Sequence, residues 1–197
     1  GSITTSGTQD YEGAITLTGN TTLVSGDQIT FDTTVNSEGS ETNNLTVTAT
    51  ELQVDGIIGG TQTLGAISIT GILDLNAAIT NATSLSVSST SNLGANVTTS
   101  STQTYTSGVT LSGADRTLTA STVNFGSTLN GGTNALTVTG ALDLDGAATN
   151  LSTLSVSGTS NLGANVTTTS TQTYSGAVTL SGGDRILTGT IINFGST

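Results

Sequence analysis

Residues 86–128 read SVSSTSNLGANVTTSSTQTYTSGVTLSGADRTLTASTVNFGST, and residues 155–197 repeat them without a gap as SVSGTSNLGANVTTTSTQTYSGAVTLSGGDRILTGTIINFGST. The offset in numbering is 69, and 32 of the 43 aligned pairs are identical. A more diverged copy, ITTSGTQDYEGAITLTG, starts at Ile3 and matches the stretch that starts at Val97, at an offset of 94. Tandem duplication therefore divides the chain into repeats 3–96, 97–165 and a partial 166–197.

A shorter unit recurs inside these repeats: an aliphatic residue, Thr or Ser, a second aliphatic residue, Thr or Ser, and a small residue. The eight occurrences have a mean spacing of about 23 residues, which is typical of solenoid coils. The two long offsets, 94 and 69, differ by about one such coil, so the long repeats are expected to span four and three coils. The unit starts at Ile15, Leu45, Ile67, Leu85, Val109, Leu136, Leu154 and Val178.

Strict alternation of apolar and polar residues predicts short β-strands, and Gly and Asn between the runs supply corners. No run shows the helical periodicity that an amphipathic helix requires. An immunoglobulin-like sandwich does not require repeats in register, whereas a stacked parallel β-helix does. We therefore expect residues 1–197 to form one all-β domain, a right-handed parallel β-helix (β-solenoid) of about eight coils. The right hand rests on the family resemblance described below, together with the general preference for right-handed parallel crossovers.

Stacking of equivalent units would place their aliphatic residues in inward columns and their hydroxyl residues in one outward array, with coils about 4.8 Å apart. Such T-x-T ladders are similar to those of ice-binding solenoids, although Ser lacks the methyl group of Thr. Thr also fits an ordinary half-exposed strand, so the array can be purely structural. The candidate binding face comprises Thr16, Thr18, Thr46, Thr48, Ser68, Thr70, Ser86, Ser88, Thr110, Ser112, Thr137, Thr139, Ser155, Ser157, Thr179 and Ser181.

The composition excludes several kinds of chemistry. The chain has no Cys and no His, so it has no thiolate nucleophile, no imidazole base, no disulfide and no ordinary zinc site. We expect no cofactor and no metal site. A net charge of −11 repels nucleic acid and anionic membranes. No apolar run approaches the ~20 residues of a transmembrane helix, and no basic-then-apolar leader opens the chain.

The phrases TQTY, GAVTLSG and NFGST, taken with the long duplication, resemble the repeat regions of large bacterial surface adhesins of the filamentous haemagglutinin, or two-partner secretion, type. This resemblance covers nearly the whole chain and implies a right-handed β-helix and an extracellular, cell-surface location. The secretion domain of that family has an Asn-Pro signature, which a chain without proline lacks. We therefore expect an internal or C-terminal piece of a longer array.

A few charged and aromatic residues are candidates for other roles. Asp143 and Asp145 lie two apart on one predicted strand, where they could bind a cation, act as a carboxylate pair or simply be solvated. The Asp115-Arg116 and Asp184-Arg185 pairs are expected to be exposed local ion pairs. An enlarged corner loop at 36–44 carries Glu38 and Glu41 and is either a partner site or a tolerated insertion. The six aromatic residues are expected to pack in the core: Tyr11, Tyr105, Tyr174, Phe31, Phe125 and Phe194.

Three hypotheses of function follow. The first is a structural or adhesive segment of an exported surface protein, a stalk, fibre shaft or filament, with no catalytic residue. Its partner would be a cell-surface glycan or protein, or the chain itself through end-to-end or lateral assembly. The second is binding of ice or carbohydrate through the Ser/Thr array. The third is a polysaccharide-acting enzyme that uses Asp143 and Asp145.

Overall fold

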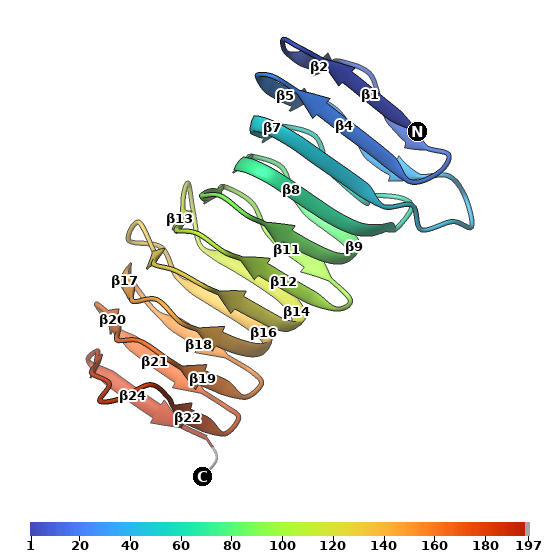
Figure 1. Cartoon of the computed structure of the whole chain (residues 1–197). Coiled ribbons are helices and arrows are strands. Elements are labelled where there is room, and N and C mark those ends of the chain that lie inside the picture. The colour runs from blue at the N-terminus through green and yellow to red at the C-terminus, as the bar shows by residue number, and fades with distance from the viewer. Residues whose placement is uncertain (196–197) are drawn as a thin grey trace.

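The chain forms one stack of coils whose strands pair in parallel, as the sequence predicts. Each coil is called a turn of the solenoid below. The computed structural model describes residues 1–195 and contains strands but no helix among them. The strand pairings are parallel and join residues about one turn apart. Figure 1 shows the turns following one another in a single direction, from the N-terminus (blue) at the top to the C-terminal turns (red) at the bottom. The fold is therefore a β-solenoid.

Each turn has three sides, which we name faces A, B and C. The long strands bend around a corner and belong to two faces. Face A contains β1 (Ser2–Thr5), β4 (Thr21–Ser25), the first halves of β7 (Leu45–Val54) and β8 (Leu64–Leu75), the second half of β9 (Ile79–Val87), β12 (Thr102–Tyr105), the second halves of β14 (Arg116–Phe125) and β16 (Leu136–Leu144), β19 (Ser160–Leu162) and β22 (Val178–Leu180).

Faces B and C follow face A in each turn. Face B contains β2 (Gln9–Tyr11), β5 (Gln28–Phe31), the second halves of β7 and β8, β10 (Ser91–Leu93), β13 (Val109–Leu111), β15 (Leu129–Asn130), β17 (Ala148–Leu151), β20 (Val166–Thr168) and β23 (Leu187–Thr188). Face C contains β3 (Ile15–Leu17), β6 (Val35–Ser37), a bridge at Ile58, the first half of β9, β11 (Val97–Thr99), the first halves of β14 and β16, β18 (Leu154–Val156), β21 (Thr171–Tyr174) and β24 (Ile191–Phe194).

The solenoid has ten turns, close to the eight that the sequence predicts. The residues that stack in face A run from Ser2 to Thr179 in nine steps. A turn therefore has roughly 20 residues, at the short end of the range for solenoid repeats. The mean spacing of about 23 residues in the sequence is longer than one turn, because it is the distance between similar five-residue units. These units do not all lie on one face. At about 4.8 Å per turn the rod is about 48 Å long.

The duplicated segments occupy different faces. The strand TQTY lies on face A as β12 and on face C as β21, and its diverged copy TQDY lies on face B as β2. Two residues that are 69 positions apart, such as Ser86 in the second half of β9 and Ser155 in β18, lie eleven successive faces apart along the chain. With three sides per turn this is three and two-thirds turns, and the offset of 94 is four and two-thirds. The expectation of three and four whole coils was wrong, although the two offsets do differ by one turn.

The core is a set of aliphatic columns inside the triangle. In face A, Leu45, Ile67 and Leu85 stack on one another and are almost fully buried. Each fully buried aliphatic side chain contributes about 1.5–3 kcal/mol. Aromatic side chains pair between turns: Tyr105 and Phe125 stack at 5.5 Å between ring centroids, and both are buried. The prediction that all six aromatic residues pack in the core was wrong for Phe194, which is exposed because no further turn lies over it in the described residues. The corresponding pairs in the first and last turns, Tyr11–Phe31 and Tyr174–Phe194, are 5.6 Å apart.

Some corners require glycine, and Gly140 provides a test. Gly140 has φ +134°, and a Cβ there would overlap the backbone carbonyl oxygen of Ala120 in the preceding turn. Gly140→Ala should therefore lower the free energy of unfolding by about 1–3 kcal/mol. Gly13→Ala is the matched control, because an added Cβ there meets no atom within 4 Å. Urea unfolding followed by circular dichroism measures both variants, and equal midpoints would contradict the corner geometry.

Candidate functional site

The sixteen predicted Ser/Thr residues all face outward, but they do not form one array. None of the sixteen residues is buried. Eight lie on face A or its following corner, two belong to face B and six belong to face C. The single ladder predicted from the sequence is therefore wrong, because the repeats are offset by a third of a turn. Face A carries Thr46, Thr48, Ser68, Thr70, Ser86, Ser88, Thr179 and Ser181; face B carries Thr110 and Ser112; face C carries Thr16, Thr18, Thr137, Thr139, Ser155 and Ser157.

Face A nevertheless carries a continuous column of hydroxyl groups. It runs through six successive turns, at the register of Thr46, and mixes residues from the predicted set with residues outside it. Two amides and one carboxylate, at Asn124, Asp143 and Asn161, continue the column before it ends at Thr179. The hydroxyl part of the column is regular and uncharged. Its six positions are Ser2, Thr22, Thr46, Ser68, Ser86 and Thr104.

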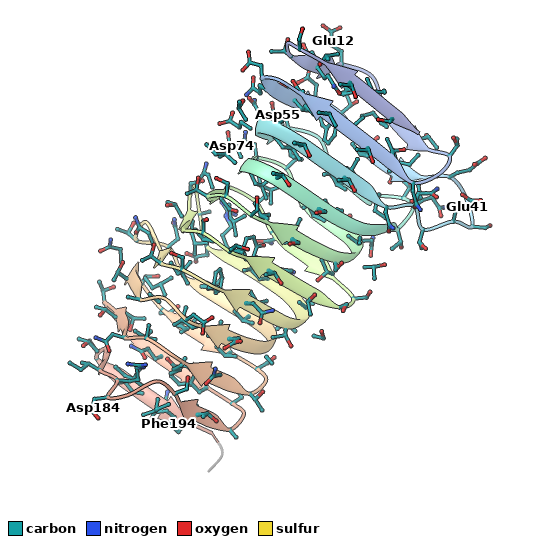
Figure 2. All side chains as sticks on the ribbon, viewed as in Figure 1. Glu12, Glu41, Asp55, Asp74, Asp184 and Phe194 are labelled. Carbon is teal, nitrogen blue, oxygen red and sulfur yellow. The ribbon has the colours of Figure 1, made fainter. Side chains whose placement is uncertain are left out.

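Face B is more acidic, and amide side chains stabilise its carboxylates. Asn92 Nδ2 donates to Asp74 Oδ1 at 2.8 Å across adjacent turns, and Asn76 Nδ2 donates to Asp55 Oδ1 at 2.9 Å. Gln53 Nε2 donates to Asp55 Oδ2 at 2.6 Å. Figure 2 shows Asp55 and Asp74 on neighbouring turns along one edge of the stack. Charge-assisted hydrogen bonds from amides thus hold several acidic residues in a chain that has only two arginines.

The candidate carboxylate pair has the same structural arrangement. Asp143 lies on face A and accepts a hydrogen bond from Asn161 Nδ2 at 2.8 Å, as Asp74 does from Asn92. Asp145 is exposed at the next corner. Within residues 1–195, no three Asp or Glu side chains gather in a group that could hold a metal ion. The two Leu-Asp-Leu segments, 73–75 and 142–144, therefore each use their aspartate in an Asp–Asn hydrogen bond between turns.

The Arg116 guanidinium does not form the ion pair that was expected with Asp115. Its Nε donates to the carbonyl oxygen of Leu93 at 3.1 Å and to that of Ser112 at 3.2 Å. The Asp115 carboxylate accepts the backbone N–H of Ala135 at 2.8 Å. Partial burial lowers the pKa of Arg116, and the charge of Asp115 opposes this shift. Arg116 and Asp115 thus stabilise a corner through the backbone, whose polar groups need partners where the strands end.

The loop at 36–44 projects from the stack, and its tip is exposed. Figure 1 shows it extending beyond the neighbouring corners, and Figure 2 shows Glu41 on it. Its base is fixed by buried Asn43, whose Nδ2 donates to the Leu17 carbonyl oxygen at 2.8 Å and whose backbone N–H donates to Ser37 Oγ at 2.9 Å. Glu38 and Glu41 remain solvent-exposed. The loop is therefore an anchored acidic protrusion.

A buried glutamine in the TQ-x-Y segments was not predicted. Gln103 is fully buried, and its Nε2 donates to the carbonyl oxygens of Val97 at 3.1 Å and Thr119 at 2.9 Å. Its Oε1 accepts the Tyr105 hydroxyl at 3.3 Å. Gln172, its counterpart in the later repeat, makes the equivalent contacts. The signal was present in the alternation, because Gln and Tyr share the inward side of the strand.

The buried tyrosines make the free energy of unfolding depend on pH. Burial raises the pKa of Tyr105 and of Tyr174 above the ordinary value of 10.0. Above about pH 10 the unfolded chain releases phenolic protons that the folded chain retains, so the free energy of unfolding must fall as pH rises. The chain has no Lys or Cys to titrate in the same range. Urea midpoints measured from about pH 8 to about pH 11 should decline, and less steeply for the double variant Tyr105→Phe and Tyr174→Phe. A flat profile would contradict the burial of these hydroxyls.

A shallow groove of about 510 Å³ runs along face B across successive turns. Thr110, from the predicted set, lies in it. Ile72 and Val109 supply apolar surface, and the polar lining residues include Asn92 and Asn130. The groove thus combines an apolar floor with hydroxyl and amide groups.

Comparison with known proteins identifies no relative. No family model matches the chain, and neither a curated protein nor a solved structure is significantly similar to it. Among residues 1–195 there is no helix long and apolar enough to cross a membrane.

Proposed function

We propose that the chain is a structural or adhesive rod segment of an exported bacterial surface protein. The observation that carries the proposal is a single stack of ten parallel turns with one continuous core, in which Asp–Asn pairs, buried glutamines and aromatic pairs join several neighbouring turns. Such a stack resists bending and shearing along its whole length, as a stalk or fibre shaft must. The resemblance of TQTY, GAVTLSG and NFGST to adhesin repeats supports the surface location.

The location can be tested directly. An antibody raised against the purified chain should label intact cells of the source organism, and brief protease treatment of those cells should remove the label. Labelling that requires permeabilised cells would contradict the proposal.

The shape of the rod can be tested separately. Small-angle scattering of the chain at low concentration should give a rigid rod about 48 Å long, and a compact or flexible particle would remove the mechanical basis of the proposal.

The second candidate function is binding of ice or a neutral carbohydrate. The observation that favours it is the uncharged hydroxyl column of face A, together with the groove of face B. Thr46→Lys would disrupt the column and Thr110→Lys the groove, whereas Thr137→Lys on face C is the matched control. Thermal hysteresis or glycan-array binding that is lost only in the first or second variant would support this candidate. Activity equal in all three variants, or none in the parent chain, would contradict it.

A further inference from the structure

The groove on face B contains a hollow where one corner position lacks a side chain. The carbonyl oxygens of Thr90, Gly108 and Thr128 each accept a backbone N–H group from the preceding turn, so these residues lie one above another along the groove. Because the middle residue is glycine, nothing projects between the side chains of Thr90 and Thr128. The volume of the groove, about 510 Å³, is in the range of ligand-binding sites.

A row of polar side chains lies beside this hollow, two residues further along the same strands. The parallel register of β10, β13 and β15 stacks Asn92, Thr110 and Asn130 on successive turns. All three line the groove, and none of them is buried. Asn92 and Asn130 lie on strands two turns apart, which is about 9.6 Å. The row thus has an amide at each end and a hydroxyl group in the middle.

Hydrogen bonds hold the two amides in opposite senses. Asn92 Nδ2 donates to Asp74 Oδ1 at 2.8 Å, which leaves Asn92 Oδ1 as an acceptor. Asn130 Oδ1 accepts the backbone N–H of Gly132 and Asn150 Nδ2, each at 3.1 Å, which leaves Asn130 Nδ2 as a donor. The row therefore presents an oriented acceptor at one end and an oriented donor at the other.

An amide group of a ligand complements this row. In a parallel sheet, a peptide amide on a middle strand donates its N–H to one neighbouring strand and accepts through its C=O from the other, so it bridges groups two strand spacings apart. Asn92 and Asn130 lie on strands with this separation. An amide placed over Thr110 can therefore donate to Asn92 Oδ1 and accept from Asn130 Nδ2.

The hollow beside the row complements a neutral sugar ring. Ile72 is 39% exposed and offers apolar contact, while Gly108 lets a ring approach the backbone closely. The hydroxyl groups of Thr90 and Thr128 flank the hollow and can both donate and accept hydrogen bonds. None of the described residues that line the groove is charged, and the net charge of −11 repels anionic sugars.

We propose that the groove of face B binds a neutral N-acetylated hexosamine, with the acetamido group between Asn92 and Asn130 and the sugar ring in the hollow at Gly108. A plain hexose has a hydroxyl group in place of the acetamido group, so it does not bridge the two amides. The inference deepens the adhesive form of the proposed function and rests on that function for its biological meaning.

A series of matched ligands tests the chemistry. Di-N-acetylchitobiose and cellobiose have the same linkage and differ at the second ring carbon, which carries an acetamido group in the first and a hydroxyl group in the second. In saturation-transfer NMR with the purified full chain, the acetyl methyl protons of di-N-acetylchitobiose should receive the strongest saturation. Cellobiose should bind about tenfold more weakly or worse. N-acetylglycinamide, which has amides but no sugar ring, should give no signal.

An isosteric variant tests the oriented donor. Asn130→Asp keeps an oxygen that can accept from Gly132 but removes the Nδ2 donor, so it should weaken the binding of di-N-acetylchitobiose about tenfold. Asn96→Asp is the matched control, because Asn96 lies outside the groove and its Oδ1 also accepts a backbone N–H, from Thr117 at 2.9 Å. The control should bind like the parent chain.

A second variant fills the hollow. Gly108→Val should abolish binding, and it should still fold, because an added Cβ there meets only Thr128, at 3.2 Å from its Oγ1. Ala177→Val is the matched control, since Ala177 is the counterpart of Gly108 in the later repeat and lies outside the groove. Circular dichroism of both variants should match that of the parent chain.

The outcomes separate the inference from the proposed function. Equal binding of cellobiose or of N-acetylglycinamide would overturn the recognition of an acetamido sugar. A parent chain that binds nothing, or binding that survives Gly108→Val, would overturn the site. Binding together with an intracellular antibody signal would support the site while the surface function fails. Surface labelling without binding would overturn the site and leave the rod function standing.

Discussion

Deletion of residues 86–154, one whole unit of the long duplication, should leave a cooperatively folded solenoid that is shorter by three and two-thirds turns. The joined strand would read from Leu85 directly into Ser155 and Val156, which replace Ser86 and Val87. Every downstream strand would move to the neighbouring face, because the deletion removes eleven sides of the triangle rather than a multiple of three. The rod should shorten by about 18 Å at ~4.8 Å per turn.

The physical reason is that the three faces are interchangeable. The sequence Val-Thr-Leu occurs twice, on face B as β13 and on face A as β22. Its diverged copy, Ile-Thr-Leu, lies on face C as β3. Each of these strands alternates inward aliphatic and outward hydroxyl residues, and each ends in a corner. A strand that meets these two conditions can therefore occupy any side of the triangle.

The matched control is a deletion that is one residue shorter, 86–153, so that Leu85 is followed by Leu154. The strand is then out of step by one residue, which turns Ser155 inward and Val156 outward. We expect this variant to lose several kcal/mol of stability or to fail to fold, because polar side chains enter the core. Scattering and urea unfolding distinguish the two deletions. Equal stability of both, or failure of the 86–154 deletion alone, would contradict the interchangeability of the faces.

Phe125→Ala should cost about 3–5 kcal/mol of unfolding free energy, whereas Phe194→Ala should cost about 1 kcal/mol or less in the isolated molecule. Both residues lie in the sequence NFGST, and both stack on a tyrosine, at 5.5 and 5.6 Å between ring centroids. They differ in burial, since Phe125 is 1% exposed and Phe194 is 53% exposed. Truncation of the first leaves a cavity between two turns, and truncation of the second removes atoms from an open end.

The measurement is urea unfolding at a concentration low enough to keep the chain monomeric, with tyrosine fluorescence as the probe. Equal costs for the two substitutions at low concentration would show that the last turn is covered within the single chain.

The sequence was sufficient to predict the class of fold. Alternation in phrases such as LTVTA at Leu45 determines which residues point inward, and repetition in register requires equivalent strands to stack. Four of the six aromatic residues, Phe31, Tyr105, Phe125 and Tyr174, could be placed in the core for the same reason. These predictions depend only on local periodicity and on the identity of the copies.

The sequence was not sufficient to predict which strands are neighbours. Leu85 and Val109 begin successive similar phrases, but the first lies on face A and the second on face B. The number of corners between two phrases determines their faces, and a short corner has little sequence signal. The single hydroxyl array failed for this reason, although each predicted residue does face solvent.

Prediction of the Asp–Asn and buried glutamine contacts requires the same information, namely the length of each turn. Asp143 and Asn161 lie one turn apart, and their hydrogen bond requires a turn of that length at that place. Arg116 reaches the Leu93 carbonyl oxygen in the preceding turn rather than the carboxylate next to it in sequence. Once the turn lengths are known, Asp143 can be recognised as a link between turns through its hydrogen bond with Asn161.

The most direct test of the account is disulfide formation between introduced cysteines in adjacent turns. Ser86 and Thr104 are paired residues of β9 and β12, so the Ser86→Cys and Thr104→Cys variant places two outward side chains on strands about 4.8 Å apart, within the range for a disulfide. The account predicts that this pair oxidises rapidly within one chain, whereas Ser86→Cys with Thr110→Cys does not, because Thr110 lies on face B. Oxidation of the second pair but not the first would show that similar phrases stack on one face, and would contradict the shift of a third of a turn.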